Sequence, residues 1–215
     1  MKNFYLLLFC FFSLAFKAQK DKINFEEIKT NVQDSTSKYF YERIVFRFQY
    51  DPTLLDSLEM KHLYYGKFYS KYKRDGFNFD KFDFVKNFRS RDSEENIKKA
   101  DQLLYKDPTD LEVLAIVLQV FSKENSDNRE FGLRAMQLRR LLETILKSGS
   151  GEDENSAFTV MSVSDEFVLA GFLKINLHTF KRASKMTKDA TFDRWKDGKK
   201  MLIFRIMKDE SLAKD

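Results

Sequence analysis

Apolar residues recur at helical spacing through residues 20 to 150, which predicts a series of amphipathic helices. A first stripe contains Ile23, Phe25, Ile28 and Val32. A second covers Tyr39 to Phe48 and stops before Asp51-Pro52. After a turn at residues 51 to 53, the third stripe contains Leu54, Leu58, His62, Tyr65 and Tyr69. The segment from Phe77 to Phe88 mixes a period of two with helical spacing, and a short helix near Phe82 to Phe88 is favoured.

The clearest helical pattern lies between Ser93 and Ser148. Ser93 is expected to cap a helix, and Asp107-Pro108 breaks the chain before the next one. Residues 111 to 121 are apolar almost all round, which suits a buried strand or a buried helix, and the length and neighbours favour a helix. A third amphipathic helix runs from Phe131 and stops at Gly149. The stretch resembles a tetratricopeptide-type helix pair at Pro108, Leu114, Val117 and Phe121, and departs from it at Asn96, Leu103 and Leu118.

The periodicity changes after the Gly-, Ser- and acid-rich loop at residues 148 to 155. Residues 157 to 163 alternate like a strand, Ser164 begins a short helix, and residues 175 to 180 suit a second strand. Residues 192 to 196 and 201 to 207, joined at Asp197-Gly198, predict a β-hairpin. The expected fold is α+β and mostly α. Stacked, degenerate tetratricopeptide-like helical hairpins over residues 19 to 148 precede a small α/β region over residues 149 to 215, packed on the helices.

The first eighteen residues have the form of a secretory signal peptide. Lys2 precedes an apolar run from Phe4 to Phe16, which is too short to span a membrane, and Ala18 offers a small residue at the exit. Cleavage is expected after Ala18 or Gln19, and the protein is then periplasmic or extracellular. The alternatives are an uncleaved anchor and a buried N-terminal helix. Cys10 does not suit lipidation because Phe9 precedes it and the apolar run continues past it.

Composition excludes several classes of protein. Hydrophobic residues make up 43% and charged residues 33% of the 215 residues, a globular balance. The single Cys excludes a disulfide scaffold and a Cys-based zinc site. Loss of Lys2 and Lys17 with the signal would lower the net charge from +5 by two, to +3. That small excess, together with export, argues against nucleic acid as a partner.

Few residues suggest chemistry. Motifs of serine hydrolases, P-loops and dinucleotide-binding folds are absent from the sequence, and Ser148-Gly149-Ser150-Gly151 is interpreted as a helix end and loop rather than an anion site. The two histidines, His62 and His178, lie far apart and form no H-x-x-x-H pair, so no metal or cofactor is expected. Two basic runs are expected to line solvated faces, the first of them helical: Lys181, Arg182, Lys185 and Lys188, and Lys67, Lys71, Lys73 and Arg74.

Three segments resemble a family of uncharacterised exported proteins of Bacteroidota, a domain of unknown function. They are Ser37-Lys38-Tyr39-Phe40-Tyr41, Lys61-His62-Leu63-Tyr64-Tyr65-Gly66-Lys67-Phe68, and the stretch from Leu146 through Ser148-Gly149-Ser150-Gly151 to Val163-Ser164-Asp165-Glu166-Phe167. Ser150 stands where the family is expected to carry Asp, and Phe167 where it carries Tyr. Residues 201 to 206 are similar to its closing strand more loosely. The resemblance implies an exported helical protein with a small C-terminal α/β element, and implies no activity.

The leading hypothesis is a non-enzymatic module that binds a protein or peptide of the cell envelope, as stacked helical hairpins often do. His62, Tyr64 and Tyr65 are the expected partner-binding patch, or alternatively pack or cap. A second hypothesis is an envelope hydrolase that uses His62 with Asp165 or Glu166. A third is attachment to anionic lipid or surface glycan through the basic face from Lys181 to Lys188.

Overall fold

The computed structural model describes residues 23–72, 78–124 and 129–208. The expected signal segment, residues 1–18, lies outside this part of the chain, as do Lys73, Arg74 and Phe77. No helix within it is both long and apolar enough to cross a membrane.

Three helices open the described chain: α2 (Phe25–Gln33), α3 (Tyr41–Tyr50) and α4 (Ser57–Gly66). Short 3-10 turns at Pro52–Leu54 and Lys67–Tyr69 flank α4. The third helix is therefore shorter than the stripe from Leu54 to Tyr69 predicts. Asp56 accepts a hydrogen bond from the backbone N–H of Glu59, whose side chain accepts from Asp56 in return, and this capping box begins the helix at Ser57.

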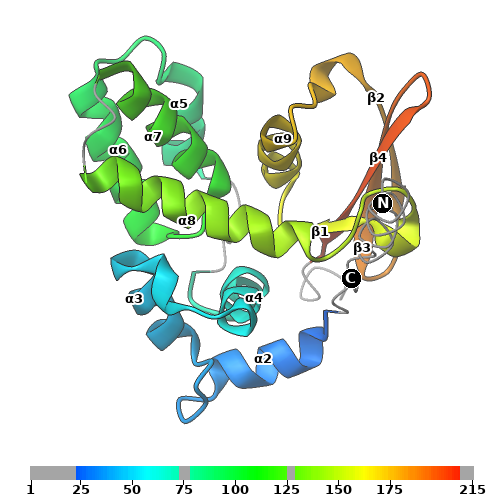
Figure 1. Cartoon of the computed structure of the whole chain (residues 1–215), viewed down its shortest axis with the longest axis horizontal. Coiled ribbons are helices and arrows are strands. Elements are labelled where there is room, and N and C mark those ends of the chain that lie inside the picture. The colour runs from blue at the N-terminus through cyan, green and yellow to red at the C-terminus, as the bar shows by residue number, and fades with distance from the viewer. Residues whose placement is uncertain (1–22, 73–77, 125–128, 209–215) are drawn as a thin grey trace, which may run out of the picture.

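Four helices follow: α5 (Phe79–Asn87), α6 (Ser93–Lys106), α7 (Leu111–Glu124) and α8 (Arg129–Leu146). The favoured helix near residues 82 to 88 is confirmed, and the apolar segment from residue 111 is a buried helix rather than a strand. The expected cap at Ser93 is wrong by one residue, since the Asp92 carboxylate accepts from the backbone N–H of Glu95. Helix α7 packs against both α6 and α8, so the chain forms helical hairpins (Figure 1). Their relation to tetratricopeptide repeats stays a prediction.

The C-terminal part combines one helix, α9 (Val163–Phe172), with a four-stranded mixed sheet. The strands are β1 (Phe158–Val160), β2 (Lys181–Met186), β3 (Ala190–Asp197) and β4 (Lys200–Met207), in the order β1-β4-β3-β2. Strand β1 runs parallel to β4, and the other pairs are antiparallel. The predicted hairpin of β3 and β4 is confirmed. Gly198 in its turn has φ 57°, a value that favours glycine.

Two local predictions in this region are wrong. The strand expected over residues 175 to 180 is replaced by a 3-10 turn at Leu177–Thr179, which Asn176 caps by accepting from the backbone N–H of His178. The helical face expected for residues 181 to 188 is the edge strand β2, which pairs with β3 over all six of its residues. Every β2 residue is exposed, so its sequence carries no alternation of apolar and polar positions.

The architecture is α+β and mostly α, as expected. Helix α8 crosses the centre of the view in Figure 1, with α3 and α4 on one side and α5 to α7 on the other, and it leads toward β1 and the sheet. A continuous apolar core joins the helices to the sheet, because α4 packs on α2, α3 and α8, while α8 and α9 both contact β1. Strand residues alternate between the two sheet faces. Trp195 on β3 donates a hydrogen bond to Glu166 of α9, so α9 covers the face that carries Asp193 and Trp195.

Candidate functional site

The residues expected to form a partner-binding patch are all buried. On α4, His62, Tyr64 and Tyr65 are 3%, 2% and 1% exposed. Within the described residues their side chains are therefore not accessible to a partner. The alternative, that they pack and cap, agrees with their positions. Helix α4 is enclosed by α2, α3 and α8 and is therefore buried on more than one side.

His62 joins α4 to the first helices. Its ring stacks on Tyr39, with centroids 3.9 Å apart, and its Nδ1 lies 2.8 Å from the Leu58 carbonyl oxygen. Its Nε2 lies 3.0 Å from the amide nitrogen of Asn31. A neutral imidazole satisfies both contacts, since Nδ1–H donates to the carbonyl and Nε2 accepts from the amide. Burial lowers the pKa of His62, which favours this neutral form.

The two tyrosines fasten α4 to the C-terminal region. The Tyr64 hydroxyl donates to Asp165 Oδ2 at 2.7 Å, and the backbone N–H of Met161 lies 3.2 Å from the same hydroxyl oxygen. The Tyr65 hydroxyl donates to the Thr159 carbonyl on β1 at 3.2 Å. Burial raises the pKa of both tyrosines, so both remain protonated donors. Their contacts span about a hundred residues of sequence and place β1 and α9 against the helical part.

The structure does not bring together the residues of the hydrolase hypothesis. His62 and Tyr64 are two positions apart on α4 and so point to nearly opposite sides of the helix. Asp165 bonds to Tyr64, and Glu166 bonds to Trp195. His62 makes its hydrogen bonds to Leu58 and Asn31 instead. General acid–base chemistry needs direct hydrogen-bond reach, so the structure does not support a catalytic pairing of His62 with Asp165 or Glu166.

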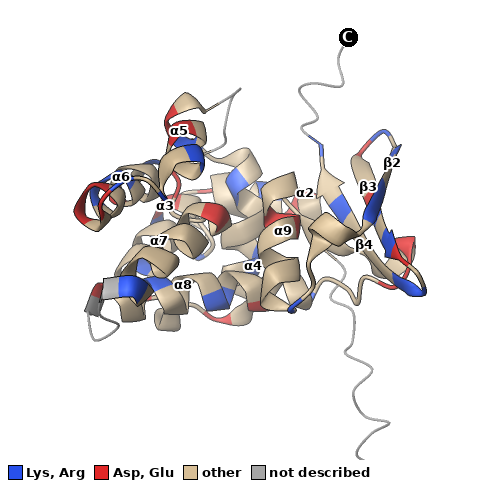
Figure 2. Cartoon of the chain, turned by 90° about the horizontal axis from the view of Figure 1, so that it is seen from above, with Lys and Arg blue, Asp and Glu red and all other residues tan. Residues whose placement is uncertain are grey.

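The basic runs are divided among separate ion pairs. Lys67 contacts Asp107 at 2.6 Å, and Lys71 contacts Glu42 at 2.8 Å. On β2, Arg182 pairs with Asp193 and Lys185 pairs with Glu154. Figure 2 shows acidic residues interspersed with the basic ones over the helices, with Lys and Arg also on the β2–β3 hairpin. Among the described residues no group of three or more His, Cys, Asp or Glu side chains could hold a metal ion.

Two carboxyl groups lie buried between α9 and the sheet. Glu166 and Asp193 are both 0% exposed, and Trp195 Nε1 donates to Glu166 Oε2 at 2.8 Å. Burial, and then the negative charge of Asp193, raise the pKa of Glu166 to about 8. Burial acts to raise the pKa of Asp193 as well, but hydrogen bonds from Arg182, Ser184 and Glu166, together with the Arg182 charge, outweigh it and lower that pKa. At neutral pH Glu166 therefore holds a proton that it can share with the Asp193 carboxylate. No solvent reaches either group, so we assign the pair to the core rather than to catalysis.

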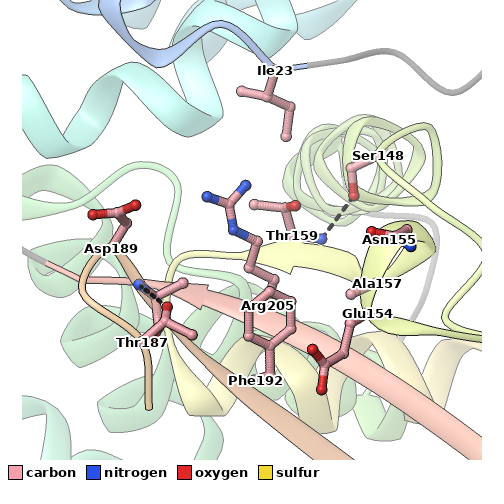
Figure 3. Close-up of a pocket in the computed structure, with 11 residues that line it drawn as sticks. Ile23, Ser148, Glu154, Asn155, Ala157, Thr159, Thr187, Asp189, Phe192 and Arg205 are labelled. Atoms are coloured by element: carbon pink, nitrogen blue, oxygen red, sulfur yellow. Dashed lines mark hydrogen bonds between the residues drawn. The ribbon is translucent and has the colours of Figure 1, made fainter. Parts of the chain in front are cut away.

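A cavity of about 420 Å³ lies on the opposite face of the sheet (Figure 3). Its volume falls within the range of about 300–1,000 Å³ typical of small-ligand sites. Side chains from the sheet form its floor, and the loop after α8, the turn between β2 and β3 and Ile23 before α2 complete its lining. The lining residues are Ile23, Ser148, Glu154, Asn155, Ala157, Thr159, Thr187, Asp189, Ala190, Phe192 and Arg205.

The loop expected to end a helix at Gly149 shapes this cavity. Helix α8 ends at Leu146, before the expected stop. A Cβ on Gly149 would lie 2.2 Å from the Ser156 carbonyl oxygen, so only glycine permits this close approach. The backbone N–H groups of Ser150 and Gly151 both donate to the same Ser156 carbonyl, at 2.8 and 2.7 Å. They are therefore occupied within the loop, which agrees with its interpretation as a loop rather than an anion site.

Arg205 provides the free positive charge of the cavity. It lies on β4 opposite Thr159 of β1 and Phe192 of β3, and its guanidinium lies 5.7 Å from the ring centroid of Phe25. Within the described residues it makes no hydrogen bond or ion pair through that group. Thr159 beside it is 4% exposed, and its hydroxyl has no hydrogen-bond partner among the same residues. Figure 3 shows the guanidinium extending into the cavity near Thr159.

Two acidic side chains line the same cavity but differ in their pairing. Glu154 is neutralised by Lys185 at 2.8 Å and by Arg194 at 3.5 Å. Asp189 lies in the turn between β2 and β3, and its carboxylate makes no ion pair within the described chain. The cavity thus offers a guanidinium and a carboxylate that make no ion pair within the described chain, and the hydroxyl of the largely buried Thr159. Such a set could contact oppositely charged groups of one ligand at two places.

Sequence reasoning did not find these cavity residues. The one available signal is Arg205, a charged residue within the apolar segment from Met201 to Ile206, where a core-facing strand would carry none. Thr159 and Asp189 carry no comparable signal, because a threonine in a strand and an aspartate in a turn are ordinary.

The fold and the cavity define an α+β protein with a helical body, a C-terminal mixed sheet and a polar cavity where the two meet. The chain belongs to the family described as Domain of unknown function (DUF4919), which it matches over residues 26–206. The expected membership of an uncharacterised family is thereby confirmed, while the Bacteroidota origin stays a prediction. Neither the curated proteins nor the solved structures contain a match to this chain.

Proposed function

We propose that the protein is an exported, non-enzymatic binding module of the cell envelope, and that the cavity around Arg205 receives a peptide or a segment of a protein partner. The observation that carries the proposal is the half-buried Arg205 guanidinium, which has no ion pair within the described residues, beside the Thr159 hydroxyl in the cavity. Both groups can form hydrogen bonds with a ligand bound there. The signal-peptide form of residues 1–18 supports export.

The proposed site in the cavity replaces the patch expected on α4. Tyr65 of that patch keeps an indirect role. Tyr65 bonds to the Thr159 carbonyl and so holds β1 in place at the cavity wall. A change at Tyr65 would act on binding through the position of Thr159 rather than by direct contact.

Export is tested by the mass of the protein recovered from its native envelope and medium. We expect the intact mass of a chain that begins at Gln19 or Lys20. A chain that retains Met1 and stays inside the cell would contradict export.

The binding proposal is tested with a photo-crosslinking amino acid placed at Asn155, which lines the cavity, in cells that express the full chain. The matched control carries the same amino acid at Glu152, which is exposed on the same loop but does not line the cavity. We expect a discrete adduct at position 155 that is absent at position 152. Equal adducts at both positions, or none at either, would refute a ligand seat in the cavity.

A further inference from the structure

We infer that the cavity binds a compound that carries both a free carboxylate and a free ammonium group, such as a short peptide, with the carboxylate on Arg205 and Thr159 and the ammonium group toward Asp189. This inference rests on the proposed function and specifies the chemical class of the ligand.

The first step concerns the carboxylate. An arginine presents a planar fork of N–H donors that matches a carboxylate in two parallel hydrogen bonds. The Phe25 ring on one side of Arg205 leaves the ends of that fork available, and the Thr159 hydroxyl adds a third donor from the neighbouring strand. Because Thr159 is 4% exposed and Arg205 is half-buried, a carboxylate bound there is partly withdrawn from water, which strengthens its interaction with the guanidinium.

The second step concerns the ammonium group. Asp189 lines the same cavity, and a purely anionic ligand would be repelled by its carboxylate. A ligand with charges of both signs meets an opposite charge at each end. Glu154 does not compete for the ammonium group, because Lys185 and Arg194 already neutralise it.

The third step concerns size and shape. Phe192 and Ala190 contribute apolar surface to the cavity, and small aliphatic side chains suit such a floor. A volume of about 420 Å³ accommodates a short peptide but not a folded partner. A protein partner would therefore reach the cavity with a chain end or an extended segment.

The test measures the binding of the dipeptide Ala-Ala, its C-terminal amide and its N-acetyl derivative to the mature chain by calorimetry and NMR. We expect Ala-Ala to bind with a Kd below about 1 mM and each blocked form to bind about tenfold or more weakly. Equal affinity for all three, or no binding of Ala-Ala, would overturn the inference.

Paired variants locate the two charges. Arg205→Gln is expected to weaken Ala-Ala about tenfold or more, and Asp189→Asn to weaken Ala-Ala but not N-acetyl-Ala-Ala. Arg139→Gln and Asp80→Asn are matched controls outside the cavity, and Arg205→Lys keeps the charge without the fork. Thermal unfolding of each variant establishes that it folds. If Arg205→Gln binds Ala-Ala as Arg139→Gln does, the assignment of the carboxylate is wrong.

The outcome separates this inference from the function on which it rests. An adduct at position 155 without dipeptide binding would leave the binding module standing and overturn the ligand class. Failure of both experiments would overturn both.

Discussion

The buried pair of Glu166 and Asp193 predicts an unusual dependence of stability on pH. The pKa of Glu166 rises from an ordinary value of 4.5 to about 8 on folding. The folded protein therefore keeps a proton that the unfolded chain releases above pH 4.5. The stability that this proton confers is complete below pH 4.5 and is lost as pH rises toward 8.

The size of this change in stability follows from the interval between the two pKa values of Glu166. Each pH unit between the two values lowers the free energy of unfolding by about 1.4 kcal/mol, and the interval of about 3.5 units gives roughly 5 kcal/mol. Glu166 is 0% exposed, so screening by solvent does not reduce this figure. Glu166→Gln removes the titration while keeping an oxygen that accepts from Trp195 Nε1.

The assay is urea denaturation of the protein and of Glu166→Gln between about pH 5 and 8, with the difference in unfolding free energy taken at each pH. Other titrating groups, such as His62, cancel in that difference. We expect Glu166→Gln to gain stability relative to the unsubstituted protein by about 1.4 kcal/mol per pH unit. Glu94→Gln, at an exposed position, is the control and should show no such slope. A pH-independent difference for Glu166→Gln would refute the buried proton.

Other consequences concern the contacts that join the parts of the fold. Tyr64→Phe leaves the buried Asp165 carboxylate without its hydroxyl donor and should cost about 1–3 kcal/mol in chemical denaturation; an unchanged midpoint would contradict the assigned bond. Gly149→Ala places a Cβ 2.2 Å from the Ser156 carbonyl oxygen and should lower Tm, because the loop backbone must shift to admit it. Gly132→Ala is its control. It lies within α8 with nothing within 4 Å of the added Cβ, so it should stabilise by about 0.5–1 kcal/mol.

The elements with strong local signals could be predicted from the sequence. The hairpin was predictable because Asp197-Gly198 supplies turn chemistry between two segments of high strand propensity. Strand β2 was not, because Lys181 to Met186 is exposed on both faces and becomes a strand only by pairing with β3. Local pattern cannot report a partner strand that lies elsewhere in the chain.

The candidate site shows the limit of local sequence patterns more clearly than β2 does. The α4 stripe identified His62 and Tyr65 but could not show that three other helices enclose them. Arg205 and Thr159 become neighbours only through the parallel pairing of β1 with β4, across 46 positions of sequence. A site assembled by strand pairing leaves no spacing motif, so only the three-dimensional arrangement reveals it.

The order of strands in the sheet also bears on how the protein reaches its native state. Strand β4 comes last among the described strands, yet it lies between β1 and β3, so β1 has no strand to pair with until β4 is in place. Non-local pairing of this kind slows folding, because a long segment must be ordered before the contact that rewards it can form. The pairing of β1 with β4, which brings Thr159 beside Arg205, is therefore expected to form after the local hairpins of β2, β3 and β4. Until it forms, the apolar surfaces of α8 and α9 that meet β1 are expected to be less well covered, which favours aggregation of the partly folded chain.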